Sequence, residues 1–312
     1  MAKIRVKKPA AKPKARPVVT TQRPHAVARR RGRSVVRNVS ADDFLIPEEP
    51  RERIEDLYQY CTLIYGRPGI GKTTLAASWP GTMLFSCERI SKGLRVRDFN
   101  SERGGVTGWE VFLAGIELLE REENKHKVKC VCIDTLDAAH TMCMEYVCNL
   151  KGIEHPSDAS WGKGWSALRQ EFSTALSRIQ RAGYGLIMIS HSKEVTIKSH
   201  SGAEYTRIQP TASGSAYEIA KAITDMTLYT EWLRLKSGEN VRVIITEGDE
   251  VVDAKNNIEL PRYLPLKKHN GYAVLEDAFR GKKVGLDIAN LMIANTTPKP
   301  VRELLRTQKK GN

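Results

Sequence analysis

Residues 61–74 read Cys-Thr-Leu-Ile-Tyr-Gly-Arg-Pro-Gly-Ile-Gly-Lys-Thr-Thr, and this stretch predicts both the fold and a functional site. Strand-forming residues 62–65 run into a glycine-rich loop that matches G-x-x-x-x-G-K-[ST] from Gly66 to Thr73. A helix-forming run follows from Thr74 and ends at Pro80. Strand, glycine loop and helix start are the context in which this motif binds nucleotide phosphates, whereas a chance match in a glycine-rich turn would lack both flanks.

The residue types of the loop suit a phosphate ligand. Glycines let backbone N–H groups approach the ligand without an obstructing Cβ. Lys72 would place a positive charge on the β- and γ-phosphates, and the Thr73 hydroxyl would bind Mg²⁺. We therefore predict a nucleotide-binding segment made of Gly66, Arg67, Pro68, Gly69, Ile70, Gly71, Lys72, Thr73 and Thr74.

Composition allows one large domain with appendages. Of the 312 residues, 41% are hydrophobic, and no apolar run approaches the ~18 residues that a membrane span needs. The first long apolar stretch is the strand before the glycine loop, so we expect no secretory signal. The six cysteines lack two pairs at zinc-binding spacing, which favours buried free thiols in a reducing compartment over a metal site.

The positive charge is concentrated at the N-terminus. Residues 1–40 carry 13 of the 50 Lys and Arg residues and no Asp or Glu, which leaves 37 basic against 36 acidic residues elsewhere. This Pro-, Ala- and Arg-rich segment has no hydrophobic period and is expected to be disordered. It would attract nucleic acid non-specifically. The alternatives are a solubilising tail or an organelle transit peptide, whose amphipathic helix the prolines would interrupt.

Apolar runs and turn residues predict an α/β fold. Beyond the glycine loop we expect strands at 82–86, 127–133 and 185–190, and helices at 109–121, 136–150 and 166–181. Strands that alternate with helices form a mainly parallel sheet covered on both faces. Later segments predict three strands that extend this sheet in antiparallel fashion, at 204–208, 226–233 and 241–246. A short helix is predicted at 271–280.

Asp134 follows the apolar run 131–133 at the end of a predicted strand. Its carboxylate would hold Mg²⁺ opposite Thr73, because phosphoryl-transfer sites need an acidic partner for the metal. An Asp in this position is also a common helix cap. The glycine loop upstream favours the metal role.

Two further polar residues lie at the ends of predicted strands. Glu88 comes just past the strand at 82–86, where a carboxylate can act as the base that activates water; the alternative is a solvated acid near Arg89 and Lys92. His191 stands at the tip of the strand at 185–190, where it could contact the γ-phosphate, or it is structural. We predict Glu88, Lys72 and His191 as the catalytic residues.

Five motifs together resemble the compact RecA-like P-loop ATPases. They are Gly66-Arg-Pro-Gly-Ile-Gly-Lys-Thr-Thr, Leu84-Phe-Ser-Cys-Glu88, Cys132-Ile-Asp-Thr-Leu-Asp137, Gly162-Lys-Gly-Trp165 and Ile189-Ser-His-Ser-Lys193. The chain is most similar to the phage-encoded nucleotide-binding and single-strand annealing recombination proteins of this group. The glycine loop alone is typical of all P-loop NTPases. The position of Glu88 and the Ser-His pair make the chain resemble the RecA-like branch of these proteins in particular.

Together, the composition and the resemblance, which covers residues 58–265 and leaves out both tails, predict four parts of the chain. Residues 1–40 would be the disordered basic tail and 41–57 a polar lead-in. Residues 58–265 would form the RecA-like ATPase core, in which the Ser-His strand separates the glycine-loop strand from the Asp134 strand. Residues 266–312 would be a C-terminal extension with a loose basic tail.

The resemblance also implies ATP and Mg²⁺ as cofactors, and DNA-stimulated ATP hydrolysis on single-stranded DNA. The protein would assemble as a homo-oligomeric ring or filament, without a membrane, in the cytoplasm of a bacterial host or a phage-infected cell. A neighbouring subunit would supply a cation to the γ-phosphate. The candidates are Lys193, Lys198 and Lys255, and Lys255-Asn-Asn departs from the Lys-x-Arg ending expected of the group.

Two other functions remain compatible with the loop motif. One is a nucleotide-gated DNA-binding or regulatory module with little turnover. The other is a small-molecule kinase, which should carry an arginine-rich lid and an acceptor pocket that this sequence does not display.

Overall fold

The computed structural model describes residues 46–89, 92–198, 202, 204–212, 214–266, 270–286 and 291–292. The chain divides into two units, residues 1–52 and 53–312. Residues 46–52 are the described part of the first unit, and they contain neither helix nor strand. The basic tail at 1–40 and the end of the chain at 293–312 lie outside the described residues.

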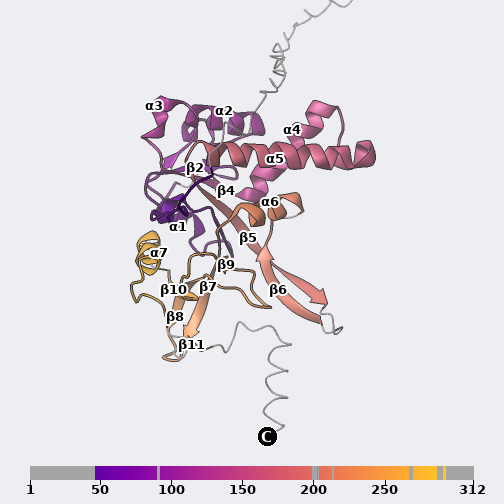
Figure 1. Cartoon of the computed structure of the whole chain (residues 1–312). Helices are drawn as coiled ribbons and strands as arrows, with labels where there is room; N and C mark the ends of the chain where they lie inside the picture. The colour runs from indigo at the N-terminus through magenta and orange to yellow at the C-terminus, as the bar shows by residue number, and fades with distance from the viewer. Residues whose placement is uncertain are drawn as a thin grey trace, which may run out of the picture. The chain divides into compact units, whose positions relative to one another are not determined.

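The second unit is built on one large sheet (Figure 1). The strand order along it is β10-β8-β7-β1-β5-β4-β2-β3. These strands are β1 (Thr62–Gly66), β2 (Thr82–Ser86), β3 (Arg97–Asp98), β4 (Cys130–Asp134), β5 (Gly185–Lys198), β7 (Met226–Leu235), β8 (Asn240–Ile245) and β10 (Tyr263–Pro265). Three more pair beside this path, namely β6 (Glu204–Pro210) with β5, and β9 (Lys255–Asn256) and β11 (Leu291–Met292) with β7. From β7 to β3 neighbouring strands on the path pair in parallel. The strand β8 pairs antiparallel with β7, and β10 pairs antiparallel with β8.

Helices cover both faces of the sheet. They are α1 (Lys72–Ala77), α2 (Trp109–Leu119), α3 (Glu122–Lys125), α4 (Leu136–Lys151), α5 (Lys163–Arg181), α6 (Ser215–Ile223) and α7 (Gly271–Phe279). Short 3-10 turns lie at η2 (Leu57–Gln59), η3 (Ser101–Arg103), η4 (Pro156–Asp158) and η5 (Ser160–Gly162). The helices α2, α4, α5 and α6 pack on one face, and α1 and α7 pack on the other.

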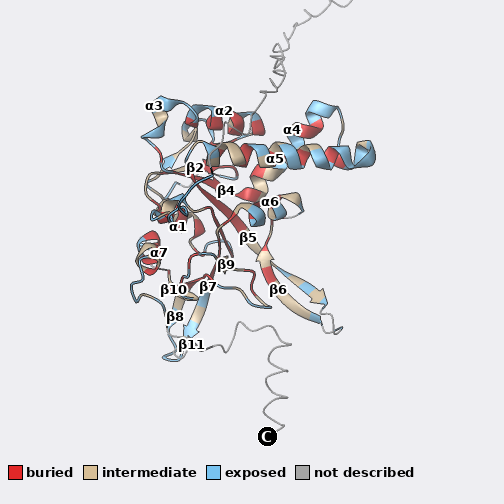
Figure 2. Cartoon of the chain, viewed as in Figure 1, coloured by how far each residue is buried: buried red, intermediate tan, exposed pale blue. Residues whose placement is uncertain are grey.

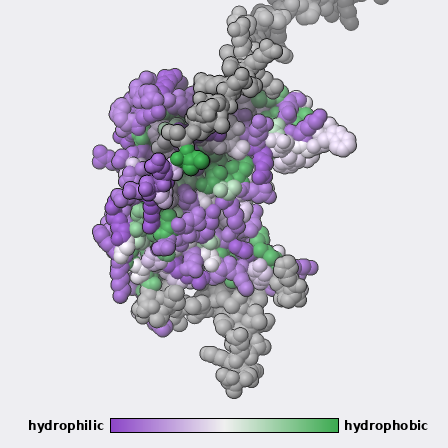
Figure 3. All heavy atoms as spheres, in the orientation of Figure 1, coloured by the Kyte–Doolittle hydropathy of each residue, from purple (hydrophilic) through white to green (hydrophobic). Residues whose placement is uncertain are grey.

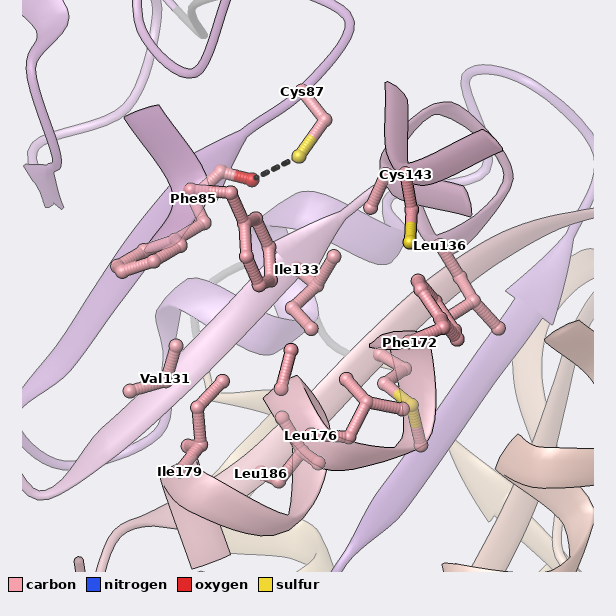
Figure 4. Close-up of a cluster of buried hydrophobic side chains, with 14 of the residues drawn as sticks. Phe85, Cys87, Val131, Ile133, Leu136, Cys143, Phe172, Leu176, Ile179 and Leu186 are labelled. Atoms are coloured by element: carbon pink, nitrogen blue, oxygen red, sulfur yellow. Dashed lines mark hydrogen bonds between the residues drawn. The ribbon is translucent and has the colours of Figure 1, made fainter. Parts of the chain in front are cut away.

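The core follows from the alternation of side chains along the buried strands. Val131 and Ile133 of β4 face α4 and α5, where they meet Phe172 and Leu176 (Figure 4). Cys132 of the same strand faces the cluster beneath α1 and α7. Figure 2 shows the buried residues along the central strands and the inner sides of the helices, and most of the face seen in Figure 3 is hydrophilic.

The predicted fold class is confirmed: a mainly parallel sheet with helices on both faces and an antiparallel extension. The strand order also confirms the RecA-like arrangement, because β5, which carries Ser190 and His191, lies between β1 and β4. The six cysteines are buried and free, as the sequence predicts. Among the described residues, every helix is too short or too polar to span a bilayer.

Two local predictions were wrong, and one helix was missed. The strand predicted at 185–190 continues to Lys198, so His191 is not at a strand tip. The strand at 226–233 was placed in the antiparallel extension, but β7 pairs in parallel with β1. The helix α6 was not predicted. It is short, and its apolar residues Ala216, Ile219 and Ala220 are stabilised by packing against the core.

Candidate functional site

The predicted site residues meet at the carboxyl ends of the parallel strands. The sheet register pairs Gly66 of β1 with His191 of β5, and it pairs Asp134 of β4 with Ile189 of β5. Glu88 lies two residues after the end of β2, the other neighbour of β4. In an open parallel sheet, ligands bind at this edge. Residues far apart in the sequence are therefore neighbours here because of strand order alone.

The loop requires glycine at both ends, for close backbone approach at Gly66 and for backbone conformation at Gly71. A Cβ at Gly66 would lie 2.5 Å from the carbonyl oxygen of Thr230 on the neighbouring strand β7. Gly71 has φ +108° where α1 begins, a conformation that L side chains rarely adopt. The Nη1 atom of Arg242 also lies 3.0 Å from the place where a Gly71 Cβ would be. Gly66 and Gly71 are therefore required by the backbone structure of this loop, apart from any role in ligand binding.

Lys72 is buried, with 5% of its surface exposed. Its Nζ donates to the carbonyl oxygens of Gly66 at 2.9 Å and Arg67 at 3.1 Å, and it lies 3.3 Å from Nδ1 of His191. Burial lowers the pKa of Lys72, and the nearby carboxylates of Asp134 and Glu88 oppose this shift. An ammonium held this way by neutral acceptors can still offer its positive charge to an anion.

Asp134 accepts a hydrogen bond of 2.7 Å from Thr73 Oγ1. Burial raises the pKa of Asp134, and the Glu88 carboxylate raises it further, while the Thr73 hydrogen bond and Lys72 lower it. A carboxylate and a hydroxyl oxygen are the hard ligands that Mg²⁺ prefers, and Mg²⁺ usually completes its shell with phosphate oxygens and water. The donor set at this position therefore fits Mg²⁺.

Glu88 is held at the same edge by Thr135, which caps the start of α4, and by His191 of β5. Its Oε1 accepts a hydrogen bond of 2.7 Å from Thr135 Oγ1, and its Oε2 lies 3.7 Å from Nε2 of His191. The Glu88 side chain is 44% exposed. The carboxylate is thus oriented by the protein and accessible to water, which are the two conditions for a general base.

Sequence reasoning missed a second layer of polar residues behind His191. Ser190 Oγ donates to Asp137 Oδ2 at 2.8 Å, lies 3.1 Å from Thr211 Oγ1 and accepts from the backbone N–H of Ala212 at 3.2 Å. These contacts tie β5 to α4 and to the segment after β6. The sequence signals for this layer were the Ser190-His191 pair and the placement of Asp137 three residues after Asp134.

The three candidate lysines for a trans-acting cation have different surroundings. Lys193 donates to the carbonyl oxygen of Thr211 at 3.3 Å, and Lys255 donates to that of Lys221 at 3.2 Å. Lys198 lies at the end of β5 beside Glu204, at 3.4 Å. Which of them serves a neighbouring subunit remains a prediction.

The AAA domain family profile matches residues 59–258, which include every residue of this site. The chain belongs to the AAA domain family. With its glycine loop and the strand order described above, this AAA-domain protein is a P-loop ATPase.

No curated protein matches the sequence of this AAA-domain protein. Among solved structures, it is similar to a KaiC-like protein from the hyperthermophilic archaeon Pyrococcus horikoshii OT3, with 12% sequence identity and a TM-score of 0.38. That match covers 68% of this chain and 88% of the archaeal one.

Proposed function

We propose that this AAA-domain protein hydrolyses ATP with Mg²⁺ and acts on single-stranded DNA in recombination, annealing or replication. The observation that carries the proposal is the convergence of Lys72, Thr73, Asp134, Glu88 and His191 at one edge of the sheet. It brings together a phosphate-binding cation, a metal-binding pair of oxygens and an oriented carboxylate.

In this proposal Lys72 and the loop amides bind the phosphates, and Thr73 and Asp134 hold Mg²⁺. The ion would supply positive charge against the phosphate oxygens. Glu88 takes a proton from water as the water oxygen bonds to the γ-phosphorus. The bond from that phosphorus to the bridging oxygen breaks, and ADP leaves.

The geometry of β5 supports coupling between the nucleotide and a polymer ligand. The first residues of β5 are buried in the core, and His191 lies beside Lys72 and Glu88. The same strand then runs on to Lys198 and pairs with β6 as a hairpin that extends away from the helices (Figure 1). The hairpin carries Lys193, Lys198 and Arg207, which can contact phosphates. The basic segment at 1–40 would add sequence-independent affinity for DNA.

Assembly as a homo-oligomeric ring or filament is also part of the proposal. A second subunit would place one of Lys193, Lys198 or Lys255 against the γ-phosphate. In the described part of the chain, Asp134 bonds to Thr73 and Glu88 contacts Thr135 and His191, and neither carboxylate bonds to a lysine or arginine. An added cation stabilises the charge that develops during phosphoryl transfer.

The test measures ATP hydrolysis with and without an unstructured oligonucleotide, in a series of salt concentrations. Stimulation by the oligonucleotide that weakens as salt rises supports the proposal. DNA binding that depends on ATP but proceeds without turnover indicates a nucleotide-gated module instead. Transfer of phosphate to a small molecule, with no effect of DNA, indicates a kinase.

Two variants make the assay specific. Lys72→Ala should abolish ATP binding or turnover, because it removes the charge that the loop carbonyls and His191 hold in place. Lys151→Ala, which changes an exposed lysine in the last turn of α4, should leave both unchanged. Equal activity in the two variants would contradict the assignment of the site.

A further inference from the structure

We propose that Trp232 and Arg242 form the subsite for the base of the nucleotide, with the base stacked on the exposed indole ring. This inference rests on the proposed function, because it extends the same nucleotide site beyond the phosphates. Trp232 is 53% exposed, although it lies in a strand next to the strand of the glycine loop. No role in the phosphate or metal chemistry above uses either residue.

The sheet register places Trp232 just beyond the loop. Thr230 of β7 pairs with Gly66, where β1 ends and the loop begins. Trp232 lies two residues further along β7, which corresponds to about 7 Å, and its side chain points to the same face as that of Thr230. This is also the face of Leu228, which packs in the cluster beneath α1 and α7. The indole is therefore on the side of the sheet from which α1 leaves the loop.

Arg242 connects the indole to the loop. It is the cross-strand partner of Trp232, and its guanidinium carbon lies 5.6 Å from the centre of the indole ring. Its Nη1 donates to the carbonyl oxygen of Ile70 at 3.3 Å. A guanidinium in these positions fixes the aromatic ring relative to the phosphate-binding backbone.

The orientation expected of the triphosphate also places the base near Trp232. The groups assigned to its γ-phosphate end lie over β5, β4 and β2, all on one side of β1. The strands β7 and β8 lie on the other side of β1. A nucleotide whose γ-phosphate is near Glu88 and His191 must extend its base away from them, toward Trp232.

The surroundings of the indole favour a base over a protein partner. Next to the Trp232–Arg242 pair on the same face lies the cross-strand pair of Arg234 and Asn240. Polar neighbours of this kind do not form the apolar centre of a protein interface. They are compatible with an aromatic base, which stacks on its faces and accepts hydrogen bonds at its edge.

The experiment compares two probes, MgATP and magnesium with inorganic tripolyphosphate, by calorimetry on the full chain. The variants are Trp232→Ala and Trp232→Phe, and the control is Trp161→Ala, which removes another exposed tryptophan, located between α4 and α5. Trp232→Ala removes the stacking contact and should weaken ATP binding about 5- to 150-fold, on the basis of alanine substitutions at stacked bases. Trp232→Phe should retain most of the affinity. Tripolyphosphate affinity should be equal in all four proteins.

Each other outcome overturns the inference in a distinguishable way. If wild type binds ATP and Trp232→Ala binds it equally well, the base subsite is wrong and the proposed function stands. If wild type binds neither probe, the proposed function fails as well. If Trp232→Ala instead lowers the oligomeric mass measured by light scattering without changing ATP affinity, the indole belongs to a contact between subunits.

Discussion

Nζ of Lys72 lies 3.3 Å from Nδ1 of His191, a residue 119 positions away in the chain. A protonated lysine has three hydrogens to donate and no acceptor. Those hydrogens face Gly66 O, Arg67 O and His191 Nδ1, so a phosphate that binds Lys72 must displace one of them. With Nδ1 accepting, the hydrogen of a neutral His191 is on Nε2, which faces Glu88. The imidazole thus stands between the phosphate-binding and the water-activating residues.

Glu88→Gln should retain ATP binding while hydrolysis falls by about 100-fold or more, because an amide cannot take a proton from water. Calorimetry measures the binding and single-turnover hydrolysis measures the chemistry. Glu145→Gln, on the exposed side of α4, is the matched control and should behave as wild type. Normal hydrolysis by the Glu88 variant would show that another group acts as the base.

His191→Asn should separate binding from turnover. An asparagine can still accept a hydrogen bond from Lys72, but it is too short to reach Glu88, so we expect ATP affinity within about 3-fold of wild type and turnover lowered about 10-fold or more. Measurement of KM and kcat for ATP, with and without an oligonucleotide, checks both. Unchanged turnover would assign His191 a purely structural role.

Deletion of residues 1–40 should weaken binding to single-stranded DNA most strongly at low salt. The segment carries 13 basic residues and no acidic ones, and the release of counterions makes such binding steeply salt-dependent. Fluorescence anisotropy with a labelled oligonucleotide at several salt concentrations gives the slope for both proteins. Identical slopes would leave the segment a solubilising role.

Gly164→Ala should destabilise the protein, although replacing glycine by alanine inside a helix normally stabilises the helix by about 1 kcal/mol. A Cβ at Gly164 would lie 2.1 Å from the backbone carbonyl oxygen of Pro156, so α5 or η4 would have to shift. We expect a loss of about 1–3 kcal/mol in urea unfolding. Gly93→Ala is the control, since a Cβ there meets nothing within 4 Å, and it should change stability by less than about 0.5 kcal/mol.

Asp253→Asn should loosen the base of the β5–β6 hairpin. The Asp253 side chain is 12% exposed and accepts from Arg207 of β6 at 3.2 Å and from Tyr217 and Lys221 of α6, the latter at 3.1 Å. Loss of the charge should cost about 1–3 kcal/mol of unfolding free energy, because hydrogen bonds to a charged group are weakened. Asp277→Asn, which breaks an exposed pair with Lys282, should cost less than about 1 kcal/mol. Equal losses in urea unfolding would contradict a structural role for the Asp253 cluster.

Local signals made much of the fold predictable. The strand at 82–86 and the helix at 109–121 were readable because apolar periodicity and the flanking turn residues are properties of short segments. The order of β1, β5 and β4 followed from the resemblance to RecA-like ATPases. The boundaries of the tail, lead-in, core and extension stay predictions.

The rest depended on contacts between distant segments. The apolar run of β5 ends at Ser190, so His191 looked like the end of a strand; backbone pairing with β6 extends the strand beyond the core. The approach of Arg242 to Ile70 depends on the register of β8 on β7 and of β7 on β1, which no local pattern encodes.

Because β5 is one continuous strand, the number of residues in it determines which side chains face each side of the sheet. Side chains alternate along a strand, so His191 and Lys193 share one side while Ser192 and Glu194 share the other. Inserting or removing a single residue between His191 and the hairpin would exchange the two sides and shift every pairing with β6. Changes in the length of this segment are therefore tolerated only in steps of two residues, or where a bulge absorbs the odd one.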